Sequence, residues 1–149
     1  MWPSLKPSQR AIVAGSINPQ SATTVKTTGW IDVAQFANLL AVISVGVISS
    51  TGTVDAKLQQ ATDNSGTGAK DITGKSITQL TQAGSNSNTQ ALINLKNDEL
   101  DANGGFRYVQ LSVTPATAAA LISANVLGFD PSYGPADTQA AASVVQIVN

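Results

Sequence analysis

The residues most suggestive of chemistry are residues 68–76, GAKDITGKS, which contain the Gly-Lys-Ser triplet of a phosphate-binding loop. Such a loop has four residues between its two glycines, but five separate Gly68 from Gly74, and Ala69 stands where the first glycine belongs. It also needs a strand before it and a helix after it, whose N-terminal amides bind phosphate. Neither is predicted here, so we interpret the segment as a surface loop in which glycines permit tight turns.

A second candidate is the acidic segment 98–104, DELDANG, in which oxygen-bearing side chains alternate before a glycine, as at the start of a calcium-binding loop. The flanking helices of such a loop are not predicted, and Gln110 stands where its closing glutamate should be. Asp, Asn and Gly readily form turns, which favours a solvated turn. We therefore expect neither a metal site nor a cofactor.

Groups suited to catalysis are scarce. The chain has no His and no Cys, which removes the usual acid–base side chain near neutral pH, the cysteine nucleophile and thiolate metal sites. Asp55, Asp63 and Asp98 offer carboxylates for glycoside hydrolysis, but the sequence gives no reason to pair them. A serine nucleophile would have only Lys or a carboxylate as its base. We predict that the protein is not an enzyme and assign no catalytic residue.

The charge content is low for a chain of 149 residues. It has 8 Lys and Arg against 9 Asp and Glu, a net charge of -1, whereas Ser, Thr, Asn and Gln together number 51. No cluster of basic residues is present, which argues against a nucleic-acid partner held by phosphate contacts. The polar surface is expected to consist mainly of hydroxyls and amides.

Targeting and membrane signals are not apparent. The first ten residues, MWPSLKPSQR, contain two prolines and no apolar core of a secretory signal. The most apolar run, residues 39–48, has ten residues, far fewer than the ~20 that a membrane helix needs. We expect a soluble protein made in the cytoplasm, without a membrane partner.

The N-terminal segment and a few aromatic residues are the candidate partner contacts. Pro3, Pro7 and Pro19 predict that residues 1–20 form an extended arm, and its apolar side chains favour docking on a neighbour. Trp and Tyr are enriched at protein interfaces and also stack on sugars, although Trp30 and Phe129 fit a core equally well. The predicted contact residues are Trp2, Leu5, Arg10, Trp30 and Tyr133.

The elements that must position these residues are short strands. Val54, Ala56 and Leu58 alternate with polar residues, the period of a half-buried strand, and residues 39–48 and 53–62 are interpreted as a hairpin. A single turn is expected at residues 33–36 and an irregular crossover with one helical turn at 70–83. Further strands are predicted at residues 23–31, 90–95, 106–114, 118–129 and 141–148, with loops or turns at 64–68, 83–88, 101–105 and 130–135.

These patterns predict an all-β protein. Six to eight short strands, turn signals every 8–14 residues and no amphipathic helix are typical of an antiparallel β-sandwich, here jelly-roll-like. We expect an extended N-terminal arm over residues 1–20 and a single sandwich domain over residues 21–149.

Several stretches resemble a known family when taken together. They are TVDAKLQQATD (53–63) with GAKDI (68–72), then ITQLTQ (77–82), and then FRYV (106–109) with LGFDPSYG (127–134). Over roughly residues 30–135, the chain resembles small structural proteins of tailed bacteriophages and prophages, of the capsid decoration or cement type. This resemblance implies a jelly-roll-like fold and display on the capsid surface after synthesis in the bacterial host. It supplies no catalytic residue.

The expected partners follow from that resemblance. They are the major capsid protein and further copies of this chain, as a dimer or trimer, with residues 1–20 reaching adjacent subunits. Two other interpretations stay open: a glycan- or host-surface-binding module of the head-fibre or adhesin type, and a component of the neck or tail.

Overall fold

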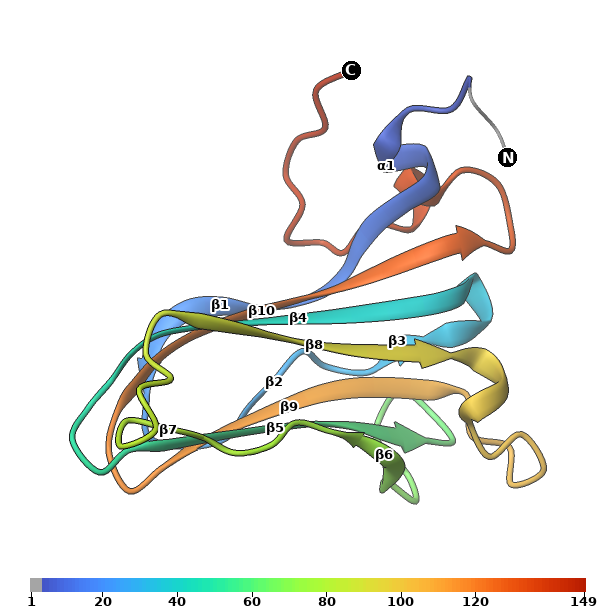
Figure 1. The fold of residues 1–149 in the computed structure, drawn as a ribbon. Helices are drawn as coiled ribbons and strands as arrows, with labels where there is room; N and C mark the ends of the chain where they lie inside the picture. Colours follow the sequence, from blue (N-terminus) through green and yellow to red (C-terminus); the bar gives the residue numbers. More distant parts are fainter. Residues whose placement is uncertain (1–3) are drawn as a thin grey trace.

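Residues 4–149, which a computed structural model describes, fold into two antiparallel sheets packed face to face (Figure 1). The strands are β1 (Ala11–Ala22), β2 (Lys26–Thr27), β3 (Ile31–Asp32), β4 (Phe36–Ile48), β5 (Thr53–Ala61), β6 (Lys70–Ser76), β7 (Leu80–Thr81), β8 (Thr89–Lys96), β9 (Tyr108–Ala116) and β10 (Ala120–Pro131). The helical segments are single turns: α1 (Pro7–Arg10), η1 (Val33–Gln35), η2 (Asn97–Glu99) and η3 (Ala136–Gln139).

The order of the strands is that of a jelly roll. One sheet runs β1-β10-β4-β8 and the other β2-β9-β5-β6, with the short β3 beside β9 and β7 beside β5. When β2 and β3 count as one interrupted strand, and β6 and β7 as another, the first strand pairs with the eighth, the second with the seventh, the third with the sixth and the fourth with the fifth. A long hairpin rolled up in this way gives the two-sheet jelly roll. The predicted antiparallel sandwich is therefore confirmed.

The core lies between the sheets and follows the two-residue period of the strands. Val54, Ala56 and Leu58 of β5 are buried, as their alternation predicted. They face β4 of the other sheet, where every second residue from Leu39 to Val45 is buried as well. Burial of one such aliphatic side chain contributes roughly 1.5–3 kcal/mol, so the shared core holds the two sheets together.

The predicted hairpin of residues 39–48 and 53–62 is wrong. Both segments are strands, but β4 pairs with β10 and β8, whereas β5 pairs with β9, β6 and β7 in the opposite sheet. Residues 49–52 cross between the sheets. Alternation specifies which face of a strand is buried but not its partner, and two strands can cover one core from opposite sides.

The N-terminal segment also differs from the expectation. Residues 11–20 of the predicted arm lie in β1, which pairs with β10 inside the sandwich. Pro19 is accommodated at an interruption of the register between Ile17 and Gln20, where a proline is tolerated in a strand. Pro7 begins the turn α1, a position that lacks a hydrogen-bonded N–H in any case.

Three further segments depart from the predicted elements. Residues 141–148 form no strand, although the Ala141 amide donates a hydrogen bond to the Val13 carbonyl (2.8 Å). Residues 70–83 hold β6 and β7 and no helical turn. The predicted strand at 23–31 is interrupted, because Gly29 adopts a φ of 77° between β2 and β3. The turns at residues 33–36 and 101–105 are confirmed.

A close approach of Phe36 to Gly128 closes one end of the core. Phe36 is fully buried, and a Cβ on Gly128 would lie 2.6 Å from three atoms of its ring. We predict that Gly128→Ala lowers the free energy of unfolding by about 1–3 kcal/mol, the usual cost of overpacking. Urea denaturation measures this cost. In the double variant with Phe36→Leu, the smaller side chain makes room, so the combined loss should be less than the sum of the single losses; strict additivity would contradict this packing.

Candidate interaction surface

The outer side of the sheet β1-β10-β4-β8 forms one broad surface, which we call the uncharged face. Register places its side chains in rows that cross the strands, such as Val13, Leu127, Leu40 and Asn94. The face consists of aliphatic, hydroxyl and amide side chains with a single aromatic ring: Val13, Ser16, Asn38, Leu40, Val42, Ser44, Gln90, Leu92, Asn94, Leu121, Ser123, Asn125, Leu127 and Phe129.

Within residues 4–149, the charged groups at this face lie at one end of it, near the C-terminal ends of β8 and β10. Lys96 ends β8 and lies opposite Asn38, whose side-chain amide donates a hydrogen bond to Asp130 near the end of β10 (2.7 Å). Leu92, in the middle of β8, and Leu121, near the start of β10, project from the rest of the face with 58% and 47% of their surface exposed. Away from the charged end, the face therefore presents apolar groups to solvent without neighbouring charge.

The outer side of the other sheet has the opposite character. Lys57 of β5 forms an ion pair with Asp71 of β6 (2.9 Å), and Asp71 also accepts a hydrogen bond from Gln59 (2.9 Å). Asp55 accepts a hydrogen bond from Gln79 (2.8 Å). These polar groups satisfy one another across the strands.

Three of the seven polar side chains of the uncharged face are available to a partner, since Ser16, Asn38, Ser44 and Gln90 already form side-chain hydrogen bonds. The side chains of Asn94, Ser123 and Asn125 make no hydrogen bond to any residue within 4–149. Removing neutral amides and hydroxyls from water costs far less than removing charges, and both groups can donate and accept. The arrangement suits the docking of another protein.

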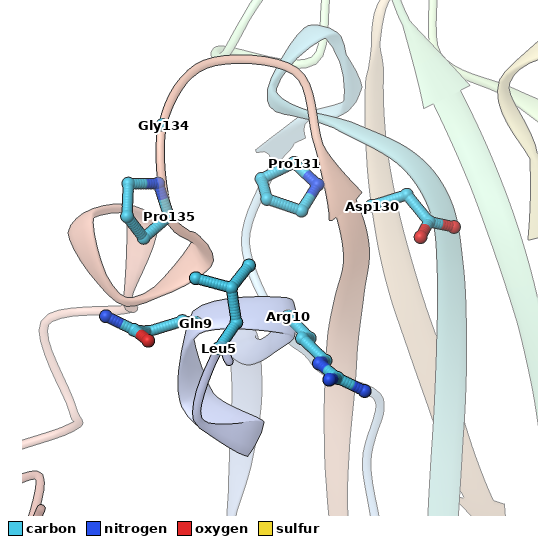
Figure 2. A pocket seen from close by; sticks show the side chains of 7 residues that line it. All are labelled: Leu5, Gln9, Arg10, Asp130, Pro131, Gly134 and Pro135. Atoms are coloured by element: carbon cyan, nitrogen blue, oxygen red, sulfur yellow. The ribbon is translucent and has the colours of Figure 1, made fainter. Parts of the chain in front are cut away.

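A groove of about 720 Å³ lies between α1 and the segment that follows β10 (Figure 2). We call this end of the sandwich, where α1 and η3 lie, the terminal end. Gln9 closes the α1 turn by accepting a hydrogen bond from the Lys6 amide (2.9 Å). A smaller hollow beside it is lined by Ala11 and Phe129, so the groove is continuous with the uncharged face. Its lining is Leu5, Gln9, Arg10, Asp130, Pro131, Gly134 and Pro135.

The structure brings together some of the predicted contact residues and separates others. Leu5 and Arg10 line the groove, whereas Tyr133, 70% exposed, is not among its lining residues and interacts electrostatically with Arg107. Trp30 lies elsewhere, against Gly66 in the loop between β5 and β6, where a Cβ would be 2.7 Å from the indole nitrogen. Trp2 falls outside the described residues. A partner role for all five stays a prediction.

Charged side chains of the phosphate-loop candidate form ion pairs with those of the calcium-loop candidate. Residues 70–76 form strand β6 rather than the expected loop, and its Lys75 pairs with Glu99 (2.8 Å). Lys70 pairs with Asp101 (2.6 Å) and lies over the ring of Phe106. Hydrogen bonds from these lysines hold the pKa of both carboxyl groups below the usual range. Within residues 4–149, no group of three or more His, Cys, Asp or Glu side chains is placed to hold a metal.

An ion pair that sequence reasoning missed fixes the start of β9. Arg107 donates from two nitrogens to Asp32 (2.8 and 2.5 Å), which also accepts from the Ala34 amide (3.0 Å) and so begins η1. The hydrogen bonds from Arg107 lower the pKa of Asp32. The two residues lie 75 positions apart, so no local pattern relates them.

The exposed Leu92 and its neighbours on the uncharged face were likewise not singled out from the sequence. Leu92 falls on the polar side of the alternation in residues 90–95, and this exposed leucine was the available signal. No such signal marked Leu40 and Val42 in the sequence, because the whole apolar run 39–48 suggested a strand buried on both faces.

Within residues 4–149, no helix has the length and apolar character needed to cross a membrane.

No protein-family model and no curated protein matches the chain. Solved structures with some similarity include those of infectious bursal disease virus, Gx strain (12% identity, TM-score 0.43, 85% of this chain and 33% of that chain) and Gt strain (13%, 0.39, 85% and 34%). A third is the naturally occurring empty particle of cowpea mosaic virus (16%, 0.34, 71% and 57%). The chain thus spans about a third of the length of the first two. With TM-scores below 0.5, the fold assignment rests on the strand order.

The ion pairs predict how stability depends on pH. The carboxyl groups of Asp32, Asp71, Glu99 and Asp101 have pKa values lowered by hydrogen bonds from Arg or Lys, so folding favours their charged forms. Their contribution is present above the unfolded-state pKa, about 4, and is lost as the pH falls through the lower folded-state values. Because the chain has no His and no Cys, stability should be nearly flat between about pH 5.5 and 8.

Urea unfolding at a series of pH values checks this prediction. The free energy of unfolding should fall below about pH 4, and Asp32→Asn should make that fall shallower by removing one of the contributing groups. A step in stability between pH 6 and 8, or an acid limb unchanged in Asp32→Asn, would contradict the assignment.

Proposed function

We propose that this chain is a virion structural protein of a tailed bacteriophage, which binds the outside of the capsid as a decoration, or cement, protein and stabilises the shell. The observation that carries the proposal is the uncharged face, a sheet surface without charge in its interior, on a sandwich whose opposite sheet pairs its own charges. The C-terminal segment lies against only the β1–β10 part of this face, where Ser143 bonds to Ser16. The partners in this proposal are the major capsid protein and further copies of the chain, without nucleic acid or membrane.

The dimensions of the uncharged face suit such a partner. Strands about 4.8 Å apart and ~3.4 Å per residue give a four-stranded patch roughly 15–20 Å wide and 25–30 Å long. Its flat area of roughly 400–600 Å² lies at or below the lower limit of about 600 Å² per partner for stable protein interfaces. A patch of this size supports modest affinity per copy, and many copies on a repetitive shell add their effects.

The groove at the terminal end supplies a second contact in this proposal. It opens beside the uncharged face, and its apolar lining from Leu5, Pro131 and Pro135 could receive a side chain of a neighbouring subunit. Arg10 also lines the groove, and a polar group at the border of an apolar contact commonly sets specificity. The sequence resemblance to capsid decoration proteins spans β3 to the end of β10 and supports the same assignment.

A glycan-binding role is the principal alternative. Sugar sites combine an exposed aromatic ring with convergent polar groups, and the exposed Tyr133 and the groove residues Arg10 and Asp130 are the elements of such a set that this end of the sandwich offers. The residues that line the groove include no aromatic ring on which a sugar could stack, and three of them are apolar, which favours the docking of a protein.

Co-sedimentation with capsids that lack the protein tests the proposal. Leu121→Lys places a charge in the uncharged face, and the matched variant Thr114→Lys places one on the outer side of β9 in the other sheet. We expect Thr114→Lys to bind like the wild type, at one to a few copies per shell subunit. Leu121→Lys should bind at least about tenfold more weakly, because a lysine must be desolvated on docking.

Other outcomes would contradict the proposal in distinct ways. Equal binding by both variants would remove the uncharged face from the interface. About a dozen copies per particle would indicate the neck or tail, and binding to glycans but not to capsids would favour the alternative role.

A further inference from the structure

The free edge of β8 differs from the other sheet edges. β8 pairs with β4 over eight residues in an uninterrupted register, from Thr89 opposite Val45 to Lys96 opposite Asn38. Within residues 4–149, the backbone groups of residues 90–95 form no hydrogen bond to any element other than β4. Half of the backbone groups of an edge strand point outwards, so β8 presents a row of unpaired donors and acceptors.

The other edges carry the features that normally block such pairing. β1 contains Pro19 and two register shifts, and the Ala141 amide bonds to its outer edge at Val13. β6 carries charged side chains and a glycine, Gly74, with a φ of 77° beside a shift in its register. β2 and β3 have two residues each. Proline, bulges, charge and short length all discourage the addition of a further strand.

β8 has none of these protections over most of its length. Its sequence, TQALINLK, contains no proline and no glycine, and its one charge is at the last residue. Leu92 in the middle of the strand is 58% exposed. A straight, uncharged edge of this kind is expected to pair with another strand in the functional state.

We propose that β8 pairs with β8 of a second copy, antiparallel and about a twofold axis at Leu92, so that two four-stranded sheets join into one of eight strands. Opposed residues in an antiparallel pair share a face. Centring on Leu92 therefore places Leu92 opposite the partner subunit's Leu92 on the outer face, with Gln90 opposite the partner subunit's Asn94. On the core side, Ala91 meets the partner subunit's Ile93.

Neighbouring registers match less well. Centring on Ile93 places Leu92 opposite the partner subunit's Asn94 and Gln90 opposite the partner subunit's Lys96, so an apolar group meets an amide. In the register centred on Leu92, Lys96 lies opposite the partner subunit's Asn88, and no two like charges meet. Because the interface uses the same strand twice, it is self-complementary and closes as a dimer, which explains why the second copy is the favoured occupant.

The dimer rests on the edge of β8 and does not require the proposed capsid role. It would nevertheless double the uncharged face, because both four-stranded sheets would present their outer sides in the same direction. A doubled face exceeds the area that a single copy offers to a shell.

Sedimentation velocity of the full chain over a range of concentrations tests the dimer. Leu92→Lys places two lysines opposite each other at the axis, and the matched variant Leu121→Lys has a similar exposed position on β10, two strands away. We expect wild type and Leu121→Lys to dimerise alike and Leu92→Lys to weaken the dimer at least about tenfold. An equimolar mixture of Leu92→Lys and Leu92→Glu should restore it, since opposite charges then meet at the axis.

Cross-linking gives an independent readout, because the chain has no cysteine of its own. Leu92→Cys should be joined into a covalent dimer by a short bismaleimide, and Leu121→Cys should not. A monomeric wild type, a dimer unaffected by Leu92→Lys, or equal cross-linking of both cysteine variants would overturn the proposal. Under the proposed function, Leu121→Lys weakens capsid binding at least about tenfold while its dimer persists, so failure of one proposal is distinguishable from failure of the other.

Discussion

The rest of the structure depends on the core that the two sheets share. Each strand has two faces, and burial of one in that core assigns the other to solvent. On β5, burial of Val54, Ala56 and Leu58 turns Asp55 and Lys57 outwards. On β4, burial of Leu39, Ala41 and Ile43 turns Leu40 and Val42 outwards in the same way. The same constraint therefore produces one charged outer surface and one uncharged one.

The few charged residues are concentrated on one of the two sheets. The ion pairs Lys57–Asp71, Lys70–Asp101 and Lys75–Glu99 all involve β6, whose edge they also block against strand addition. Over the described residues, 4–149, the sheet β1-β10-β4-β8 has no comparable pairs, and its β8 edge is open. Protection of one sheet and exposure of the other are consistent with a protein that assembles through one side.

What the sequence predicts well is local, and what it misses depends on distant parts of the chain. The alternation in residues 54–58 and 91–95 located buried faces correctly, because the period of a strand is a property of neighbouring residues. The partner of each strand is set by the whole sandwich, which explains the wrong hairpin and the absent strand at 141–148. The contact between Asp32 and Arg107 joins residues 75 positions apart, and Leu40 is only partly buried because β4 has no layer outside it.

The central claim is that the uncharged face is buried in the assembled particle. Hydroxyl-radical footprinting of the free and the capsid-bound protein tests it most directly, because leucine and aromatic side chains report on both sides of the sandwich. The account predicts strong protection of Leu92, Leu121 and Phe129 on binding, with Tyr108 on the opposite sheet as reactive as in the free protein. Protection of Tyr108 with unchanged reactivity at Leu92 and Leu121 would contradict it.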